Sequence, residues 1–260
     1  ISDTGTVRSR NEDGVWLGDR FFRSGMQTLV FDAAAVARGV LLAVADGVGG
    51  EAAGEVASRY VLEKLGAIVT DAPGDVELQK LAQWFSDVGA ALNASLCEQA
   101  EATPGRHGMA TTLTGLYIAG TRRCWVNAGD SRLYALSGGK LVQVSRDHTL
   151  REVTGNPRIP GNIIVNCFGT KNRFYLDTGV LPADASLFLL CSDGLSDYAD
   201  AGQLERIVRE AGGVLESGAP GRDGQERKAL ADAARKLVDA ALAGGGGDNI
   251  TAVLVWVRYL

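Results

Sequence analysis

Several apolar runs of this chain end in an aspartate, and this pattern limits how the chain can fold. The run Leu41–Ala45 leads directly into Asp46, which small residues follow. Other runs end at Asp130 and Asp193, and Asp248 stands just before the last apolar run. A carboxylate at the edge of a core is costly unless something compensates its charge. The fold must therefore gather these acids where a compensating partner is available.

Five short apolar segments predict β-strands, because they are rich in β-branched, leucine and aromatic residues and turn residues bound them. They span residues 41–45, 112–118, 124–128, 186–191 and 250–257. Two alternating runs within 132–145 flank the pair Gly138-Gly139, which predicts a hairpin.

Helical periodicity occurs in separate stretches of the chain. Apolar residues recur at three- and four-residue steps within 75–100, where Asp75 is the expected N-cap. Similar stripes run through 52–69 and 226–242, and a shorter helix is expected after Asp200. Helices thus come in pairs rather than once between every two strands, which favours α+β layers over a doubly wound parallel sheet.

Composition excludes some classes of protein. The 260 residues include 26 basic and 31 acidic side chains, whereas a nucleic-acid binder normally carries a basic stripe. No run is long enough to predict a membrane span, and the first residues of this sequence lack the charged-then-apolar pattern that predicts a signal peptide. The four cysteines are scattered without CxxC spacing, which favours a reducing, cytoplasmic location. We expect one domain over 1–260, with no nucleic acid and no membrane as partner.

Any one of these acidic sites could be a simple turn, because aspartate caps its own turn, and Asp223 in "GRDGQ" is interpreted in this way. Together the sites argue against that interpretation, since each borders an apolar run. Few basic residues stand near enough in the sequence to pair with them. Arg132 follows Asp130 closely, and Arg8 and Arg10 precede the acidic pair Glu12-Asp13.

Convergent carboxylates without arginine partners are typical of a site for a hard cation. Oxygen ligands suit Mg²⁺, Mn²⁺ or Ca²⁺. A zinc site is not expected, because the only histidines are His107 and His148 and neither stands in a zinc motif. Several acids can hold two nearby ions, and such a pair can activate water and stabilise a displacement at phosphorus.

Six motifs of this chain resemble, in the same order, those of the metal-dependent protein phosphatases (protein phosphatase 2C, or PPM), especially the bacterial ones. The resemblance spans residues 3–255, and the motifs are "RSRNED", "VADGVGG", "MATTLTG", "NAGDSRLY", "CSDGL" and "GDNITAVLV". It implies a four-layer α-β-β-α sandwich, with two central antiparallel sheets flanked by helices and a metal centre at one edge. It also implies hydrolysis of phosphoserine and phosphothreonine by a hydroxide that bridges two Mn²⁺ or Mg²⁺ ions.

The resemblance assigns roles to individual acids. Asp46 resembles the carboxylate that bridges both metals, and Gly47 would contribute a backbone carbonyl. Asp193 and Asp248 resemble ligands of the second metal. Asp130 resembles the ligand of a third, weaker ion, with Asp193 shared between the two sites.

The remaining assignments concern the N-terminal motif and its surroundings. Glu12 and Asp13 match the acidic pair of the family, which acts directly or through coordinated water. Arg8 matches the arginine that binds the phosphate dianion, a role that suits a guanidinium group, although Arg10 is a nearby alternative. Asn249 is expected to support the site from outside the ligand set.

The chain departs from the family pattern at two places. Eukaryotic members often have a histidine, a candidate general acid, at the position of Val48. Many bacterial relatives have an apolar residue there, as this chain does. We assign neither His148 nor His107 a catalytic role. The segment after His148 is short and contains two prolines, so we expect a short flap at about 150–169 and a more open groove.

Three functions remain open from the residues alone. The first is an active phosphatase that acts on phosphorylated proteins and opposes a serine/threonine kinase. The second is a non-catalytic module that binds phosphoproteins, which would be expected to have lost ligands, and none is missing. The third is another two-metal phosphoester hydrolase, although such enzymes usually mix histidines with the acids.

Overall fold

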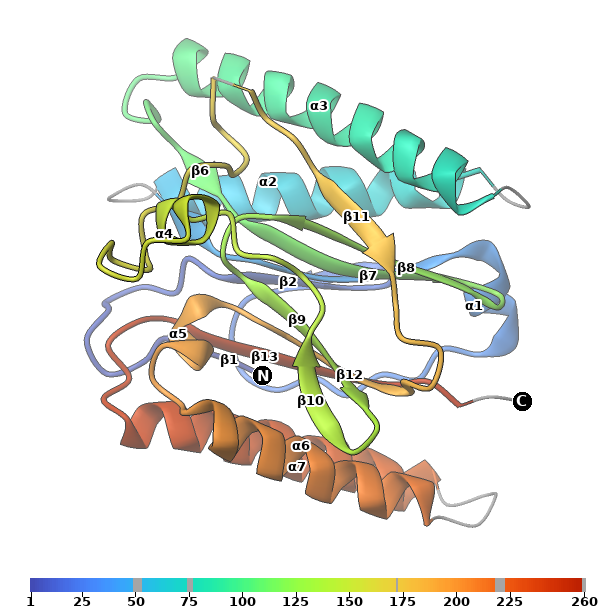
Figure 1. Ribbon diagram of the computed structural model, residues 1–260. Helices are drawn as coiled ribbons and strands as arrows, with labels where there is room; N and C mark the ends of the chain where they lie inside the picture. Colours follow the sequence, from blue (N-terminus) through green and yellow to red (C-terminus); the bar gives the residue numbers. More distant parts are fainter. Residues whose placement is uncertain (49–52, 74–76, 172, 218–222, 259–260) are drawn as a thin grey trace.

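The computed structural model describes residues 1–48, 53–73, 77–171, 173–217 and 223–258. Two antiparallel β-sheets pack face to face, and a pair of long helices covers the outer face of each sheet (Figure 1). This four-layer α-β-β-α arrangement confirms the predicted fold class. It results from the helix pairing that the sequence shows, because each pair buries one apolar stripe against one sheet.

The first sheet has six strands in the order β11-β8-β7-β4-β2-β3, and the second has five in the order β1-β13-β12-β9-β10. The strands of the first sheet are β2 (Gly14–Leu17), β3 (Arg20–Phe22), β4 (Val40–Ala45), β7 (Leu113–Ala119), β8 (Arg122–Ala128) and β11 (Asp177–Val180). Those of the second are β1 (Ser2–Asp3), β9 (Arg132–Ser137), β10 (Lys140–Gln143), β12 (Leu187–Cys191) and β13 (Ile250–Trp256). A small separate ladder pairs β5 (Gly47–Val48) with β6 (Ala110–Thr111).

The five predicted strands and the predicted hairpin are confirmed within a residue or two at each end. The short strands β1, β2, β3 and β11 were not predicted, because runs of two to four residues show too little alternation to be recognised.

Long helices cover both sheets. The helices α2 (Ala53–Ile68) and α3 (Leu78–Ala102) lie on the first sheet, and α6 (Ala201–Glu216) and α7 (Asp223–Ala243) lie on the second (Figure 1). The short elements are α1 (Ala33–Arg38), α4 (Leu150–Thr154), α5 (Asp193–Ser196) and a 3₁₀ turn (Val69–Asp71).

Two expectations about helix starts have clear outcomes, and a third lies outside the described residues. Asp200 is the N-cap of α6 and forms a capping box with Gln203, which stabilises the start of the helix. The interpretation of Asp223 as a turn residue is wrong: it is the first residue of α7, where its negative charge faces the helix dipole favourably. Asp75, the expected cap of α3, falls in the gap at 74–76.

Three apolar layers hold the sandwich together. One lies between α2, α3 and the first sheet and includes Phe85 and Leu62, and another lies between α6, α7 and the second sheet around Leu237. The layer between the sheets contains Leu116 and Phe188, both fully buried. The sheets therefore form one core.

The core of this protein is not cross-linked by disulfides. All four cysteines are free, and Cys124 and Cys191 are buried in strands. In the described part of the chain, no helix has the length and apolar character needed to cross a membrane.

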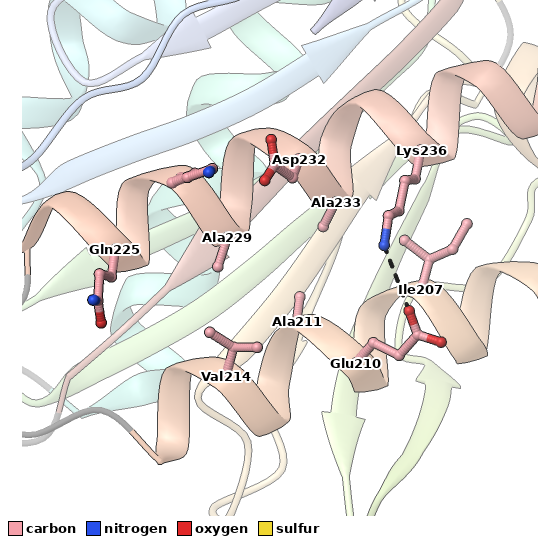
Figure 2. A pocket seen from close by; sticks show the side chains of 10 residues that line it. Ile207, Glu210, Ala211, Val214, Gln225, Ala229, Asp232, Ala233 and Lys236 are labelled. Carbon is pink, nitrogen blue, oxygen red and sulfur yellow. Dashed lines mark ion pairs between the residues drawn. The ribbon is translucent and has the colours of Figure 1, made fainter.

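A groove of ≈ 410 Å³ runs between α6 and α7 on the outer helical layer (Figure 2). Its walls include Ile207, Ala211 and Val214, and an ion pair of 3.6 Å joins Lys236 to Glu210 beside it. The groove contains none of the residues predicted to form the metal site.

The layer between the sheets gives a direct test of this architecture. Replacing Leu116 with alanine leaves a cavity between two sheets that cannot close easily, so we expect a loss of about 2–5 kcal/mol in the free energy of unfolding. Equilibrium urea denaturation measures this loss. The control is Val142→Ala on β10, where the side chain is 44% exposed and a change within about 0.5 kcal/mol is expected. Equal losses in both variants would contradict the assignment of Leu116 to the core.

Candidate metal centre

Strand register brings the predicted acids to one end of the sandwich. Gly14 on β2 pairs with Ala45 on β4, so continuing the ladder by one residue places Asp13 opposite Asp46. In the second sheet, Cys191 pairs with Arg132, and continuing that ladder by two residues places Asp193 opposite Asp130. Because the acids follow or precede strands of both sheets, the packing of the sheets decides which of them meet.

Asp13 joins the two sheets at this end. Its carboxylate is fully buried, and its Oδ2 accepts hydrogen bonds from the hydroxyl groups of Ser192 (2.7 Å) and Thr251 (2.6 Å) in the second sheet. Burial raises its pKa to about 7, with a contribution from the nearby Asp193, although the two hydroxyl donors oppose this shift. Its Oδ1 is buried and has no hydrogen-bond partner in the described structure.

Asp46 and Asp193 also meet across the sheets. Their carboxyl groups lie close to each other, which raises the pKa of Asp46 and opposes part of the rise at Asp193. Burial is the main reason that the pKa of Asp46 lies well above its usual value, and the charges of Asp13 and Asp193 raise it further. The pKa of Asp193 is also raised, mainly by burial.

Asp130 lies in the turn between β8 and β9, and none of the described ion pairs involves it. The side chain is only 5% exposed, and burial together with the charge of Asp193 raises its pKa to about 7. Arg132, the nearest arginine in the sequence, forms a two-pronged contact with Asp147 instead, with its Nη2 2.7 Å from Oδ2 and its Nε 3.1 Å from Oδ1. Among the described residues, no basic side chain therefore compensates the carboxylate of Asp130.

Glu12, Asp248 and Arg8 lie at the more exposed side of the cluster. The Nη2 of Arg8 is 2.8 Å from Oδ2 of Asp248, and Glu12 and Asp46 also act electrostatically on Arg8. Hydrogen bonding to Asp248 is the main cause of a raised pKa at Arg8. Burial is the main cause of a raised pKa at Glu12.

Asn249 holds the backbone around these acids, as its expected supporting role requires. Its Oδ1 accepts a hydrogen bond from the backbone N–H of Glu12 (2.7 Å), and its Nδ2 donates to the carbonyls of Thr4 and Arg10 (both 2.9 Å). The side chain is only 4% exposed. Asn249 therefore fixes the N-terminal motif against the start of β13.

Two glycines permit close backbone contacts beside the acids. A Cβ at Gly47 would lie 2.3 Å from the carbonyl oxygen of Gly54 at the start of α2, and a Cβ at Gly194 would lie 2.0 Å from the carbonyl oxygen of Asn249. Both positions require glycine for lack of space. Of the small residues after Asp46, Gly47 is therefore needed for packing against α2. Gly49 and Gly50 lie outside the described residues.

The sequence interpretation missed several residues of the site. Asp197 stands one helical turn after Asp193, and its pKa is raised by partial loss of water and by Asp147 and Asp248. Ser58 donates to the carbonyl of Glu12 (2.6 Å), and Arg23 donates to the carbonyl of Asp13 (2.8 Å). Asp197 could have been found from its spacing to Asp193, whereas nothing in the sequence marks Ser58 or Arg23.

The residues of this cluster fit a hard divalent cation. Three of its buried carboxylate oxygens, Oδ1 of Asp13, Asp130 and Asp193, have no hydrogen-bond partner among the described residues. Such oxygens are costly unless they are compensated, and a hard cation accepts oxygen donors of this type. Within the same described ranges, no three His, Cys, Asp or Glu side chains already stand in the arrangement of a metal site.

Comparison with known proteins identifies the class to which this four-layer sandwich with an acidic cluster at one end belongs. The family model for protein phosphatase 2C matches residues 29–232. The chain belongs to the protein phosphatase 2C family.

Individual relatives are bacterial. The chain is 34% identical over 263 residues to the serine/threonine protein phosphatase PstP of Mycobacterium tuberculosis, covering 97% of this chain and 43% of PstP. It is 28% identical to the serine/threonine phosphatase stp of Listeria monocytogenes, covering 98% and 93% of the two chains. The crystal structure of M. tuberculosis PstP superposes with a TM-score of 0.71 at 32% identity, covering 100% and 97% of the two chains. The chain therefore spans less than half the length of the PstP sequence that it matches.

The raised pKa values predict how stability depends on pH when divalent ions are removed. Asp13 and Asp130 have pKa values of about 7 in the folded protein, against 3.8 as the ordinary value. The folded state therefore binds more protons than the unfolded state between these values, and stability falls as the pH rises from about 4 to about 7. In EDTA, we expect the melting temperature to fall over this range, by about 2–4 °C for each kcal/mol lost.

A neutral replacement at one of these acids tests the cause of this fall. Asp130→Asn keeps the shape of the side chain and cannot ionise, so the melting temperature should depend less on pH than that of the wild type. The matched control is Asp239→Asn on the exposed face of α7, which should keep the wild-type dependence. Two results would contradict the assignment of raised pKa values to these acids. One is a wild-type melting temperature that rises between about pH 4 and about pH 7. The other is a pH dependence in Asp130→Asn that equals that of the wild type.

Proposed function

We propose that this chain is a protein serine/threonine phosphatase that requires Mn²⁺ or Mg²⁺. The observation that carries the proposal is the set of buried, unpartnered carboxylate oxygens on Asp13, Asp130 and Asp193 at one end of the two sheets. Membership of the protein phosphatase 2C family and the names of the relatives support it. A binding module without catalysis would have no need to retain uncompensated acids in this number.

The acids divide into groups that would hold different ions. Asp46 would be a ligand of two ions, Gly47 would add its backbone carbonyl as a further ligand, and Asp193 and Asp248 would hold the second ion. Glu12 and Asp13 would contribute directly or through water. Asp130 would hold a third, weaker ion, with Asp193 shared. When bound, the ions would supply a polarised water nucleophile and neutralise charge on the phosphoryl group.

Arg8 is the residue best placed to bind the phosphate dianion. Its side chain is 54% exposed, so a substrate can reach it, while its guanidinium lies beside Asp248 and in the field of Glu12 and Asp46. Arg10 contributes a backbone carbonyl to Asn249, and none of the described ion pairs involves its side chain. A guanidinium can bind two phosphate oxygens at once, which orients the phosphorus toward the acids.

Among the described residues that follow Asp46 directly, no side chain could protonate the leaving serine or threonine. Val48, at the position where some relatives have histidine, is 37% exposed and cannot donate a proton. Ser192 and Thr251 fix the orientation of the Asp13 carboxylate, because both donate to its Oδ2 and leave its Oδ1 without a partner in the described structure. We infer that the leaving group takes its proton from water in the site or from another group.

The proposed substrates are phosphoserine and phosphothreonine in proteins, supplied by an opposing serine/threonine kinase in the cytoplasm.

The short flap also stays a prediction. Residues 150–169 contain α4 and turns, and backbone bonds from Leu150 to Ile163 (2.8 Å) and from Val165 to His148 (2.8 Å) close the segment at its base. A short segment of this kind would leave the groove open to folded phosphoproteins.

Removing one proposed ligand tests the metal requirement. We expect the protein to hydrolyse p-nitrophenyl phosphate with Mn²⁺, to lose activity in EDTA, and to lose about 100-fold or more in kcat in Asp193→Ala, since loss of charge stabilisation of this kind costs about 10²–10³. The control is Asp239→Ala, which removes an exposed aspartate of α7 and should be active. Activity that EDTA leaves unchanged would rule out the metal reaction.

Replacing the two arginines separately tests the phosphate site. Arg8→Ala should raise KM for a phosphopeptide by about 10–100-fold, because a hydrogen bond to a charged group contributes about 1.5–3 kcal/mol. Arg8→Lys should recover only part of this loss, since lysine cannot bind two oxygens in the same geometry. Arg10→Ala is the matched comparison and should have a KM close to that of the wild type. A larger effect in Arg10→Ala would transfer the phosphate-binding role to Arg10.

A further inference from the structure

His148 lies between the turn that carries Asp130 and the segment 150–169, and the proposed reaction gives it no role. Its side chain is 3% exposed, and its ring packs against Tyr175 with 4.7 Å between ring centroids. Both ring nitrogens of this buried histidine form hydrogen bonds, and the donor and acceptor in each bond determine which groups the ring can hold in place.

The hydrogen bonds determine which nitrogen of His148 carries the proton. Nδ1 is 3.2 Å from the backbone N–H of Gly129 and 2.7 Å from the amide nitrogen of Asn166. The amide of Asn166 is itself oriented by Tyr175, whose carbonyl accepts from Nδ2 (2.9 Å) and whose N–H donates to Oδ1 (3.3 Å). Because both neighbours of Nδ1 are donors, Nδ1 must be an unprotonated acceptor.

The other ring nitrogen completes the assignment. Nε2 is 3.0 Å from Oδ2 of Asp177 on β11, a carboxylate that can only accept when ionised. The proton of the imidazole therefore lies on Nε2 and is donated to Asp177. Fixing one nitrogen of a histidine through the hydrogen bond of the other is the usual way in which proteins select a tautomer.

His148 binds both polar groups of the residue that precedes Asp130. Its ring accepts from the N–H of Gly129, and its backbone N–H donates to the carbonyl of Gly129 (2.8 Å). Gly129 has a φ of +117°, and a Cβ there would lie 2.6 Å from Thr112. The turn that carries Asp130 is thus confined between His148 on one side and Thr112 on the other.

Thr112 connects the same turn to Asp46. Its hydroxyl oxygen accepts from the backbone N–H of Asp46 (2.9 Å) and bonds to the hydroxyl of Ser131 (2.7 Å). His148, Gly129 and Thr112 therefore form one continuous set of contacts from the 150–169 segment to the strand tip at Asp46.

We propose that His148, as a neutral imidazole protonated on Nε2, is a positioning residue for the candidate metal centre. It holds the Gly129 peptide so that Asp130 faces the acidic cluster, and through Asn166 it ties this turn to the end of the 150–169 segment. The proposal rests on the proposed function, because it assigns His148 an effect on cation binding at Asp130.

The tautomer can be tested without any enzymatic activity. The chain has two histidines, and His107 is exposed in a loop, so heteronuclear NMR of His107→Gln shows only the ring of His148. In metal-free protein near neutral pH, we expect an unprotonated Nδ1 and a protonated Nε2. A proton on Nδ1, or the averaged tautomers of a solvated ring, would overturn the proposal even if the protein proves to be an active phosphatase.

Two substitutions separate the roles of the ring nitrogens. Asparagine at 148 places an oxygen near the position of Nδ1, whereas glutamine reaches toward the position of Nε2. Calorimetric titration with Mn²⁺ should give His148→Asn an affinity within about threefold of the wild type at the weaker site, and His148→Gln an affinity lower by about 10–100-fold, as is typical for residues that orient metal ligands. His107→Gln is the control and should bind as the wild type does.

The melting temperature of each variant distinguishes positioning from packing alone. A ring needed only for packing would lower the melting temperature of both variants alike and leave their Mn²⁺ affinity unchanged, which would overturn the proposal. If instead the wild type binds Mn²⁺ and shows the expected tautomer but hydrolyses no phosphoester, the proposed function fails while the positioning role of His148 stands.

Discussion

Mutual repulsion among buried carboxylates is the constraint on which this structure depends. Asp13, Asp46 and Asp193 come from both sheets and meet at one end of the sandwich, where burial raises the pKa of each. Packing of the two sheets through their shared apolar layer brings these acids close together, because the acids stand at the ends of the buried strands. The apolar layers thus supply the free energy that holds the acids in proximity, and a divalent cation is the partner that would compensate their charge.

The surrounding protein supports the acids without neutralising them. Hydroxyl groups of Ser192 and Thr251 hold one oxygen of Asp13, and Asn249 holds the backbone of Glu12. Arg132, which could have neutralised Asp130, is bound to Asp147 instead. An arginine paired with each acid would stabilise the metal-free protein, but it would occupy the oxygens that a cation needs. Buried acids without basic partners are expected to lower the stability of the metal-free fold as the pH rises toward 7, and a bound cation would remove that cost.

The same site joins segments that are far apart in the chain. Asp13 and Asp248 lie near opposite ends of the sequence, and Arg8 reaches Asp248 directly. The 150–169 segment connects to the Asp130 turn through His148 and to the strand tip through Thr112. The 150–169 segment and the acids of both sheets are therefore held in one continuous set of contacts.

The sequence by itself indicated α+β layers and the main acids, and the resemblance of its motifs implied the order of the four layers. Apolar runs set the long strands, three- and four-residue periodicity set the helix pairs, and an aspartate at the end of an apolar run marks Asp46, Asp130 and Asp193 as candidates, because burial of a charge is too costly to be accidental. Only the tertiary structure decided the partners. It directed Arg132 to Asp147, placed Asp223 in a helix, and brought His148 against Gly129, because strand register and sheet packing join residues whose sequence neighbours carry no sign of the contact.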